Sequence, residues 1–169
     1  VLAYSADHYA YWRQTLNDPK LPWGAFGENF TVQGLTEADV CIGDSWKIGD
    51  EVTLQVSQPR QPCWKLARRW KIKTLAWQVQ QTGRTGWYLR VVTEGIVAAD
   101  MPLTLVERRQ SQWTVERANR VMHIDNDDLR SAGGTRCRSA SGRKLASDVD
   151  SPSRTEHQPR FAAAIVRRE

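Results

Sequence analysis

The sequence predicts a mainly β protein, an antiparallel or mixed β-barrel with a few peripheral helices. Before residue 123, short runs in which apolar and polar residues alternate recur between turns rich in Gly, Pro and Asp. Helical patterns are few and lie between the strands, and no GxGxxG motif follows a strand. Both observations favour a barrel over a doubly wound α/β sheet, which places a helix after almost every strand.

The first half of the chain contains one helical pattern followed by strands. Spacings of three and four residues between aromatic side chains predict a helix over residues 4–16, with Ser5 as its N-cap. A loop rich in Pro and Gly follows over residues 17–30, and residues 28–34 are expected to be extended. After two Gly-Asp turns, strict alternation over residues 52–57 predicts a half-buried strand.

The second half begins with a change to helical periodicity. Apolar residues four apart predict helical structure over residues 63–83, which Gly83 ends. Strands are expected within residues 86–95 and 96–109. Thr114 is expected to cap the helix that follows.

Residues 1–123 are therefore expected to form one domain, and residues 124–169 an irregular tail. The tail is rich in Ser, Gly, Arg and Pro without an apolar period, so it cannot bury enough surface to offset the entropy of ordering. A short helix at residues 161–166 is the one exception considered. Because the chain begins at Val1 rather than Met, we also expect an upstream part of the domain to be missing.

Composition limits the partners and the compartment. The 169 residues include 24 Lys and Arg against 19 Asp and Glu, a net charge of +5, and these charges are interspersed. A mixed, solvated surface is expected rather than a nucleic-acid face. No apolar run reaches the length of a membrane span, and the three cysteines form no CxxC pair, which favours a reducing cytoplasm.

Cys63 is the first candidate for chemistry. It follows Pro59 and Pro62, which end sheet pairing and stiffen the bend, and it precedes a helical pattern whose first N–H groups stabilise a thiolate. Arg60 and the basic residues after the cysteine add positive potential, and a thiolate is a soft ligand for transition metals. A structural cysteine is an equally good interpretation, because packing is the commonest role of a free cysteine.

Two other stretches are candidates for ligand binding. Gly27, Glu28 and Asn29 precede a strand and could hold a polar ligand, although the same residues form ordinary turns. Arg84 lies between two glycines, where it could hold a phosphate, but a plain turn explains this segment equally well. Cys41 is expected to pack in the core.

The remaining patterns argue against several enzyme classes. None of the three histidines is spaced to share a metal ion with another, and the carboxylates form no recognisable acid–base pair. The sequence contains no HExxH, Walker or Ser-His-Asp pattern. Zinc protease, P-loop and serine hydrolase hypotheses therefore have little support.

Three motifs, in this order, resemble the MOSC family, which is named for the C-terminal domain of molybdenum cofactor sulfurase. They are FGENFTVQGLTEADVCIGD, VSQPRQPCWKL and QQTGRTGWYLRVVTEGIVAADMPL. The resemblance covers residues 4–122 and is greatest to YiiM-like bacterial proteins. It implies a mostly antiparallel β-barrel, in agreement with the strand pattern.

The resemblance also implies a site for molybdenum cofactor (molybdopterin), a pterin dithiolene that carries molybdenum and a phosphate. Cys63 matches the family's characteristic cysteine, which implies a molybdenum ligand and a catalytic residue. The other residues implied to bind the cofactor are Gly27, Glu28, Asn29, Gln58, Arg60, Arg84 and Arg90. Many members of the family carry a pyridoxal-phosphate label, but this sequence contains no Schiff-base lysine signature that would support it.

The implied activity is the reduction of small N-hydroxylated compounds, such as hydroxylaminopurines, with electrons from a separate flavin-type reductase. No membrane and no nucleic-acid polymer is expected as a partner, and the many tryptophans leave a homodimer open. The sequence departs from the family at both ends: it lacks an upstream strand with a His-Gly-Gly loop and, after residue 129, a helical bundle. Two alternatives therefore stay open, a carrier of the cofactor or of sulfur on Cys63, and an inactive fragment of a truncated or frame-shifted gene.

Overall fold

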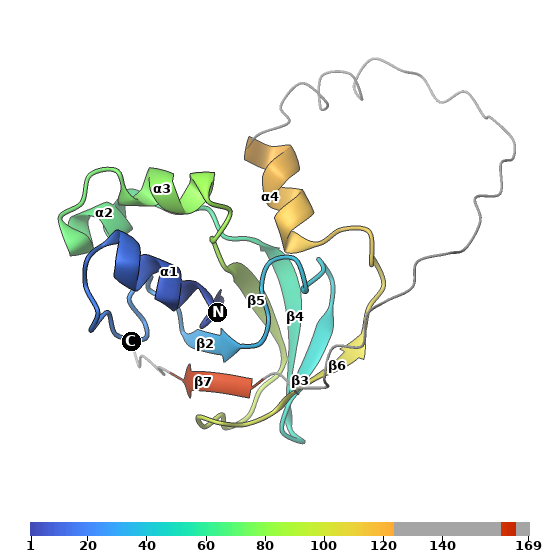
Figure 1. Cartoon of the computed structure of the whole chain (residues 1–169). Helices are drawn as coiled ribbons and strands as arrows, with labels where there is room; N and C mark the ends of the chain where they lie inside the picture. Colours follow the sequence, from blue (N-terminus) through green and yellow to red (C-terminus); the bar gives the residue numbers. More distant parts are fainter. Residues whose placement is uncertain (124–159, 165–169) are drawn as a thin grey trace, which may run out of the picture.

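Within residues 1–123 and 160–164, which the computed structural model describes, seven strands form one curled sheet in the order β6-β3-β4-β5-β1-β2-β7 (Figure 1). The strands are β1 (Leu2–Ser5), β2 (Phe30–Gln33), β3 (Ser45–Ile48), β4 (Val52–Pro59), β5 (Trp87–Thr93), β6 (Leu103–Glu107) and β7 (Arg160–Ala164). The helices are α1 (His8–Thr15), α2 (Trp64–Trp70), α3 (Leu75–Gln81) and α4 (Val115–His123). The predicted mainly β, barrel-like architecture with peripheral helices is confirmed.

The sheet is antiparallel except where β1 pairs with β2 in parallel. The longest strand, β4, pairs with β3 on one side and β5 on the other, so it lies in the middle of the sheet. The register Pro59↔Trp87 aligns the end of β4 with the start of β5. This alignment sets the segment after β4, which contains Cys63, next to the loop that precedes β5.

The start of the predicted helix over residues 4–16 is wrong. Residues Leu2–Ser5 form β1, and the helix begins only at His8. All four residues of β1 are buried and the strand has a partner on each side, so tertiary pairing overrides the local aromatic spacing. Ser5 is consequently not the N-cap; its Oγ accepts the Asp7 backbone N–H at 3.2 Å, and Asp7 takes the cap position.

The helical pattern over residues 63–83 corresponds to two helices. Lys71, in the left-handed region with φ of 56°, ends α2, and α3 begins four residues later. The apolar residues four apart, Leu66 with Trp70 and Leu75 with Val79, still pack into the same apolar cluster. The predicted cap of α4 is confirmed, because Thr114 Oγ1 accepts the Arg117 N–H at 3.1 Å.

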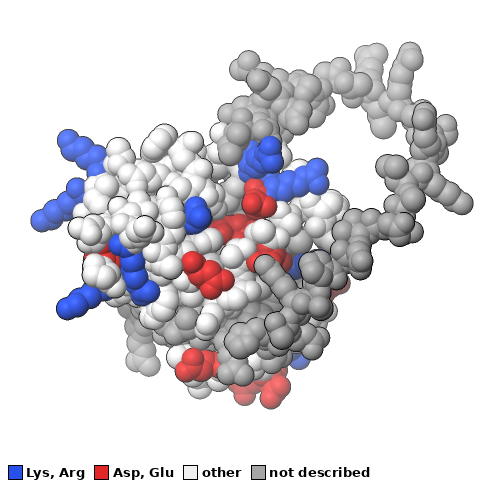
Figure 2. All heavy atoms as spheres, viewed as in Figure 1, with Lys and Arg blue, Asp and Glu red and all other residues white. Residues whose placement is uncertain are grey.

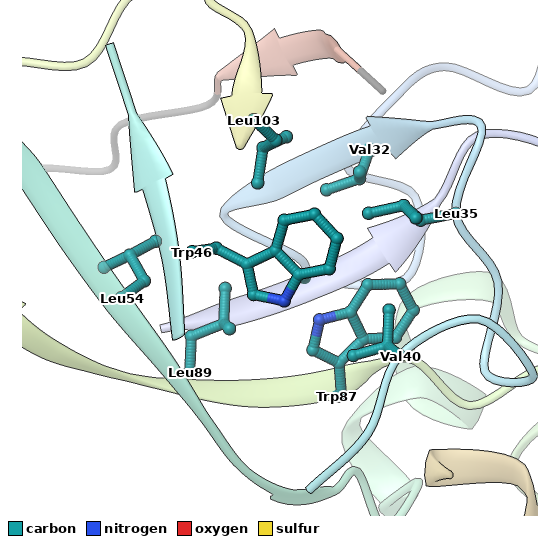
Figure 3. A pocket seen from close by; sticks show the side chains of 9 residues that line it. Val32, Leu35, Val40, Trp46, Leu54, Trp87, Leu89 and Leu103 are labelled. Carbon is teal, nitrogen blue, oxygen red and sulfur yellow. The ribbon is translucent and has the colours of Figure 1, made fainter. Parts of the chain in front are cut away.

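Two apolar clusters stabilise the fold. One fills the inside of the curled sheet, where Trp46 and Trp87 lie between β3, β5 and the neighbouring strands (Figure 3). The cavity left between these side chains is only about 10 Å³, which is room for no more than a single water. The other cluster packs α1, α2 and α3 around Trp12 and Phe26. The sheet interior is thus a packed core rather than a ligand site.

The described part of the predicted tail is a strand. Over residues Arg160–Ala164 the chain pairs antiparallel with β2, so the short helix considered at residues 161–166 is wrong where the structure describes it. Residues 124–159 and 165–169 of the predicted tail, Cys137 included, lie outside the described residues, and the predicted domain limits stay a prediction. No helix in the described ranges is both long enough and apolar enough to cross a membrane.

Candidate functional site

A cleft of about 380 Å³ opens beside Cys63 at the point where β4 gives way to α2. Four parts of the chain line it: the start of β1, the loop before β2, the segment from residue 60 into α2, and β5. The lining residues are Leu2, Phe26, Gly27, Arg60, Gln61, Cys63, Lys65, Leu66, Arg69 and Tyr88. All three sequence motifs thus contribute to one site, through Gly27, Cys63 and Tyr88.

Cys63 occupies the position directly before α2 and is exposed. Its backbone is extended, with φ of −118° and ψ of 168°, which is the usual conformation of the residue that directly precedes a helix. The interpretation of Cys63 as a buried structural cysteine is therefore wrong. The other described cysteine, Cys41, is buried, and burial is the chief cause that raises the pKa of its thiol.

The loop before β2 presents Gly27 to the cleft, and Glu28 holds that loop in shape. The Glu28 carboxylate is buried and accepts the Gly24 N–H at 3.0 Å, the Phe26 N–H at 3.1 Å and the Thr31 hydroxyl at 3.1 Å. The Tyr9 hydroxyl also donates to it, and burial followed by the Glu28 charge raises the pKa of Tyr9 well above its ordinary value. With its oxygens engaged inside the protein, Glu28 shapes the cleft wall.

Asn29 fastens the same loop to the first strand. Its Oδ1 accepts the Leu2 N–H at 2.9 Å, and its own N–H donates to the Leu2 carbonyl at 2.9 Å. Leu2 in turn lines the cleft. Neither Glu28 nor Asn29 lines the cleft itself, so direct cofactor contact by these two side chains stays a prediction, whereas their positioning of the wall is observed.

Arg60 supplies the buried positive charge of the cleft. Only 5% of its surface is exposed, and its Nη2 donates to the Phe26 carbonyl at 2.7 Å. Its backbone N–H donates to the Gly86 carbonyl at 3.1 Å. The second guanidinium nitrogen, Nη1, is buried and has no hydrogen-bond partner within the described residues. A buried donor without an acceptor is costly, which makes this nitrogen the clearest sign that the cleft receives an anionic or polar group.

Three of the predicted cofactor-binding residues lie away from this cleft. Gln58 and Arg90 are exposed on β4 and β5, and Arg84 lines a separate pocket of about 220 Å³. The Arg84 guanidinium lies over the Tyr11 ring, 4.1 Å from its centroid. The structure therefore does not bring Gln58, Arg84 and Arg90 together with Cys63, and their role as cofactor ligands stays a prediction.

Among the polar side chains of the cleft, sequence reasoning missed two and undervalued two others. Gln61 and Tyr88 line the cleft, but only the pairing of β4 with β5 reveals the position of Tyr88. Lys65 and Arg69 were expected only to add positive potential, yet both line the cleft. Helical spacing of four from Lys65 to Arg69 could have placed both on one face of α2.

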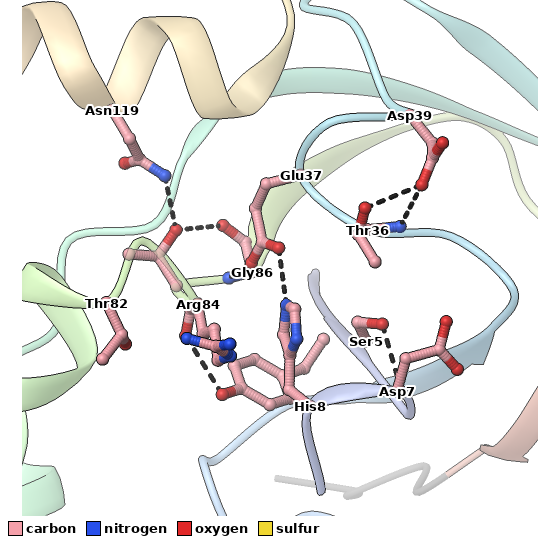
Figure 4. A network of polar contacts seen from close by, with 12 residues as sticks. Ser5, Asp7, His8, Thr36, Glu37, Asp39, Thr82, Arg84, Gly86 and Asn119 are labelled. Atoms are coloured by element: carbon pink, nitrogen blue, oxygen red, sulfur yellow. Dashed lines mark hydrogen bonds and ion pairs between the residues drawn. The ribbon is translucent and has the colours of Figure 1, made fainter. Parts of the chain in front are cut away.

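A second polar region lies around Glu37, in and beside the pocket that contains Arg84 (Figure 4). His8 Nε2 is 2.6 Å from Glu37 Oε2, and Glu37 Oε1 accepts the Gly86 N–H at 2.7 Å. Asn119 Nδ2 donates to Thr85 Oγ1 at 2.7 Å, which ties α4 to the same loop. The sequence offered no sign that His8 pairs with this carboxylate, which is 29 residues away.

Gly86 joins the two regions and tolerates no side chain. Its φ is +76°, and a Cβ at this position would approach the Ala3 carbonyl oxygen to 2.4 Å. Its carbonyl accepts from Arg60 and its N–H donates to Glu37. The glycine of the third sequence motif therefore serves the packing of the loop against β1.

Comparison with known proteins identifies relatives of this chain. The family model for the MOSC domain matches residues 1–104. The uncharacterized protein YflK of Bacillus subtilis is 48% identical over 129 residues, which is 76% of this chain and 58% of that protein. A protein named "Reductase" of Gibberella moniliformis is 39% identical over 131 residues, covering 76% of this chain and 23% of that protein.

The solved structures include YiiM from Geobacillus stearothermophilus. It is 40% identical, with a TM-score of 0.73, and the match covers 79% of this chain and 67% of that one. The chain thus spans 58% or less of the two curated relatives described above. Over the matched part, this chain shares its fold with the YiiM structure.

Proposed function

Because this chain belongs to the MOSC domain family, within its YiiM-like subgroup, we propose that it binds molybdenum cofactor in the Cys63 cleft and reduces N-hydroxylated compounds. The MOSC family is associated with molybdenum cofactor binding. One observation carries the proposal: an exposed thiol and a buried, partly unpaired guanidinium share one cleft. A soft metal and an anionic group on the same ligand would satisfy both.

The cations of the cleft fit the phosphate of the cofactor. Arg60 Nη1 is a buried donor that lacks an acceptor, and a phosphate oxygen is an acceptor of the kind that arginine binds most strongly. Lys65 and Arg69 line the same cleft and would compensate further negative charge. Gly27, which is exposed and lines the same cleft, adds no side chain that would occupy it.

Cys63 fits a metal that arrives with most of its ligands. Among the described residues, no three His, Cys, Asp or Glu side chains are grouped to hold a metal ion. A free metal ion would therefore be poorly held here, whereas a molybdenum already bound by dithiolene sulfurs needs one thiolate from the protein. The cofactor would supply the redox chemistry, and the protein would hold and orient it.

The proposed reaction converts an N-hydroxylated compound, with two electrons and two protons, to the amine and water. The relative named "Reductase" supports a reductive chemistry. The electrons would come from a separate flavin-type reductase in the cytoplasm. Exposed Gln61, Cys63 and Lys65 keep the cleft open to solvent, so that water can deliver the protons.

Metal analysis of the purified protein tests the proposal. After expression in cells that make molybdenum cofactor, wild type should contain molybdenum and Cys63→Ala at least about tenfold less. Cys41→Ala, which removes a buried thiol outside the cleft, should retain the wild-type content. Equal molybdenum in wild type and Cys63→Ala would show that the cysteine does not bind the metal. Reduction of a hydroxylaminopurine by the loaded protein, with reduced viologen as donor, tests the activity.

The exposure of Cys63 supports a second candidate, a carrier of sulfur. A solvent-accessible thiolate that shares a cleft with Lys65 and Arg69 can accept the outer sulfur of a donor protein's persulfide, which leaves as a thiolate, and pass that sulfur on to an acceptor thiolate. Mass spectrometry of the purified protein distinguishes the two functions. A persulfide on Cys63 in protein without molybdenum would favour the carrier over the reductase.

A further inference from the structure

The helix pair α2–α3 carries most of the exposed positive charge that adjoins the cleft. Between Glu51 and Glu94 the chain has eight Lys and Arg residues and no Asp or Glu. Five of them are exposed on α2 and the turn to α3: Lys65, Arg68, Arg69, Lys71 and Lys73. Figure 2 shows Lys and Arg side chains gathered on the side where Figure 1 places α2 and α3. The evenly mixed surface expected from the sequence is therefore wrong for this face.

Two tryptophans stand out from the same helix pair. Trp64 on α2 is 62% exposed and Trp77 on α3 is 63% exposed, although tryptophan normally buries most of its surface. The Arg68 guanidinium lies over the Trp64 ring, 5.8 Å from its centroid. Exposed Trp and Arg side chains are the residues that most often dominate protein–protein binding energy. Together with the five cations, these tryptophans form what we call the basic–aromatic surface.

This surface is continuous with the Cys63 cleft. Lys65 and Arg69 belong to both, since they are exposed on α2 and line the cleft. Trp64 directly follows Cys63 in the chain. A protein bound to the basic–aromatic surface would therefore cover or border the cleft mouth.

We propose that the basic–aromatic surface is the docking site for the acidic face of a reduced flavoprotein that delivers electrons to the cleft. This inference rests on the proposed function, because the reduction consumes two electrons that a donor protein must supply while its flavin is oxidised. Complementary charge speeds the encounter of such partners and orients them. Electron-transfer complexes are small and transient, so one helix pair offers enough area.

The same surface fits a nucleic acid less well. Base stacking uses open aromatic faces, and Arg68 already covers one face of Trp64. Trp64 and Trp77 are on different helices, so they do not form one continuous stacking platform. Two of the cations, Lys65 and Arg69, line a cleft of only about 380 Å³, which is too small for a nucleic-acid polymer. The acidic protein is therefore the occupant that the arrangement favours.

Charge reversal with a matched control tests the docking site. The test variant, Arg68→Glu/Lys73→Glu, reverses two surface cations that do not line the cleft. The control variant, Arg109→Glu/Lys47→Glu, reverses two exposed cations on the β3–β6 side of the sheet. Binding to a reduced flavodoxin of net negative charge is measured by calorimetry at low and high salt. The first double variant should bind at least about tenfold more weakly, with a smaller salt dependence, and the control within about twofold of wild type.

Activity with reduced viologen separates this inference from the proposed function. Both double variants should keep wild-type turnover with this small donor, because the cleft is intact. Equal flavodoxin binding by wild type and Arg68→Glu/Lys73→Glu, or no binding by wild type, would overturn the docking site. Loss of binding to a single-stranded oligonucleotide alone would assign the surface to nucleic acid instead. Absence of turnover with either donor, with the binding difference intact, would count against the reductase but not against the docking site.

Discussion

The Cys63 cleft and the Glu37 region both combine charged side chains with a glycine loop, but the buried charges at their centres, Arg60 and Glu37, differ in how fully they are paired. In the Glu37 region each carboxylate oxygen has a partner, His8 for one and the Gly86 N–H for the other. In the cleft, Arg60 Nη1 is buried without a partner and Cys63 is exposed. A paired buried network stabilises a fold, whereas an unpaired buried donor beside a reactive thiol indicates where a ligand binds.

The largest loss of stability is expected from a substitution at Gly86, which belongs to both regions. Gly86→Ala combines a positive φ with a Cβ 2.4 Å from the Ala3 carbonyl oxygen, and should lower the free energy of unfolding by about 4 kcal/mol. Gly83→Ala has a similar φ, +68°, but no atom within 4 Å, so it should cost only about 1 kcal/mol. Urea unfolding of both variants measures the difference, and equal losses would show that the close contact is unimportant.

The second largest loss of stability is expected when the hydrogen bonds of the Glu37 carboxylate are removed. Glu37→Ala leaves the buried His8 ring and the Gly86 N–H without their acceptor, so the free energy of unfolding should fall by about 3 kcal/mol. Glu116→Ala removes an exposed carboxylate that lines the same pocket, and should change stability by no more than about 0.5 kcal/mol. If chemical denaturation finds the two variants alike, the network does not stabilise the fold as its pairing indicates.

Alkaline pH should weaken the packing of α1 against β1, where the Tyr4 and Tyr9 rings meet. Burial is the main cause that raises the pKa of both Tyr4 and Tyr9 above the ordinary value, so the native state keeps their protons where the unfolded chain loses them. Their contribution is complete below about pH 10 and falls above it by about 1.4 kcal/mol per pH unit for each tyrosine.

Urea unfolding near pH 9 and pH 11 measures this slope. Tyr9→Phe should reduce it by about half, because one of the two titrating groups is removed. A slope that is independent of Tyr9 would mean that other groups cause the loss.

The smallest effect on stability is expected at Arg60. The same substitution is the sharpest test of ligand binding in the Cys63 cleft. Arg60→Met loses the bond to the Phe26 carbonyl, at a cost of about 1 kcal/mol, but should reduce retained pterin by about tenfold. Arg90→Met removes an exposed arginine outside the cleft and should retain the cofactor. Pterin fluorescence of the purified proteins provides the comparison; retention by Arg60→Met with loss in Arg90→Met would move the site to β5.

The two regions also differ in how far they could be predicted. Cys63 and Arg60 were identified because both lie in one short segment between a strand and a helix, where spacing along the chain carries the information. Glu37 and His8 were not recognised as a pair, since their 29-residue separation closes only when β1 and β2 come together. Glu28 was recognised as polar, but its role in shaping the loop depends on Tyr9 and Thr31, which arrive from α1 and β2.

The sequence by itself determined the mainly β class, strands β2, β4 and β5, the loop before β2 and the bend that carries Cys63, because periodicity, prolines and glycines act over a few residues. Only the structure decided that Cys63 is exposed rather than packed. Only the tertiary structure decided that residues 2–5 form a strand and that the loops at Gly27 and Cys63 meet in one cleft without Arg84. These outcomes depend on which strands pair and in what register, and that choice is made by burial across the whole sheet rather than by any local pattern.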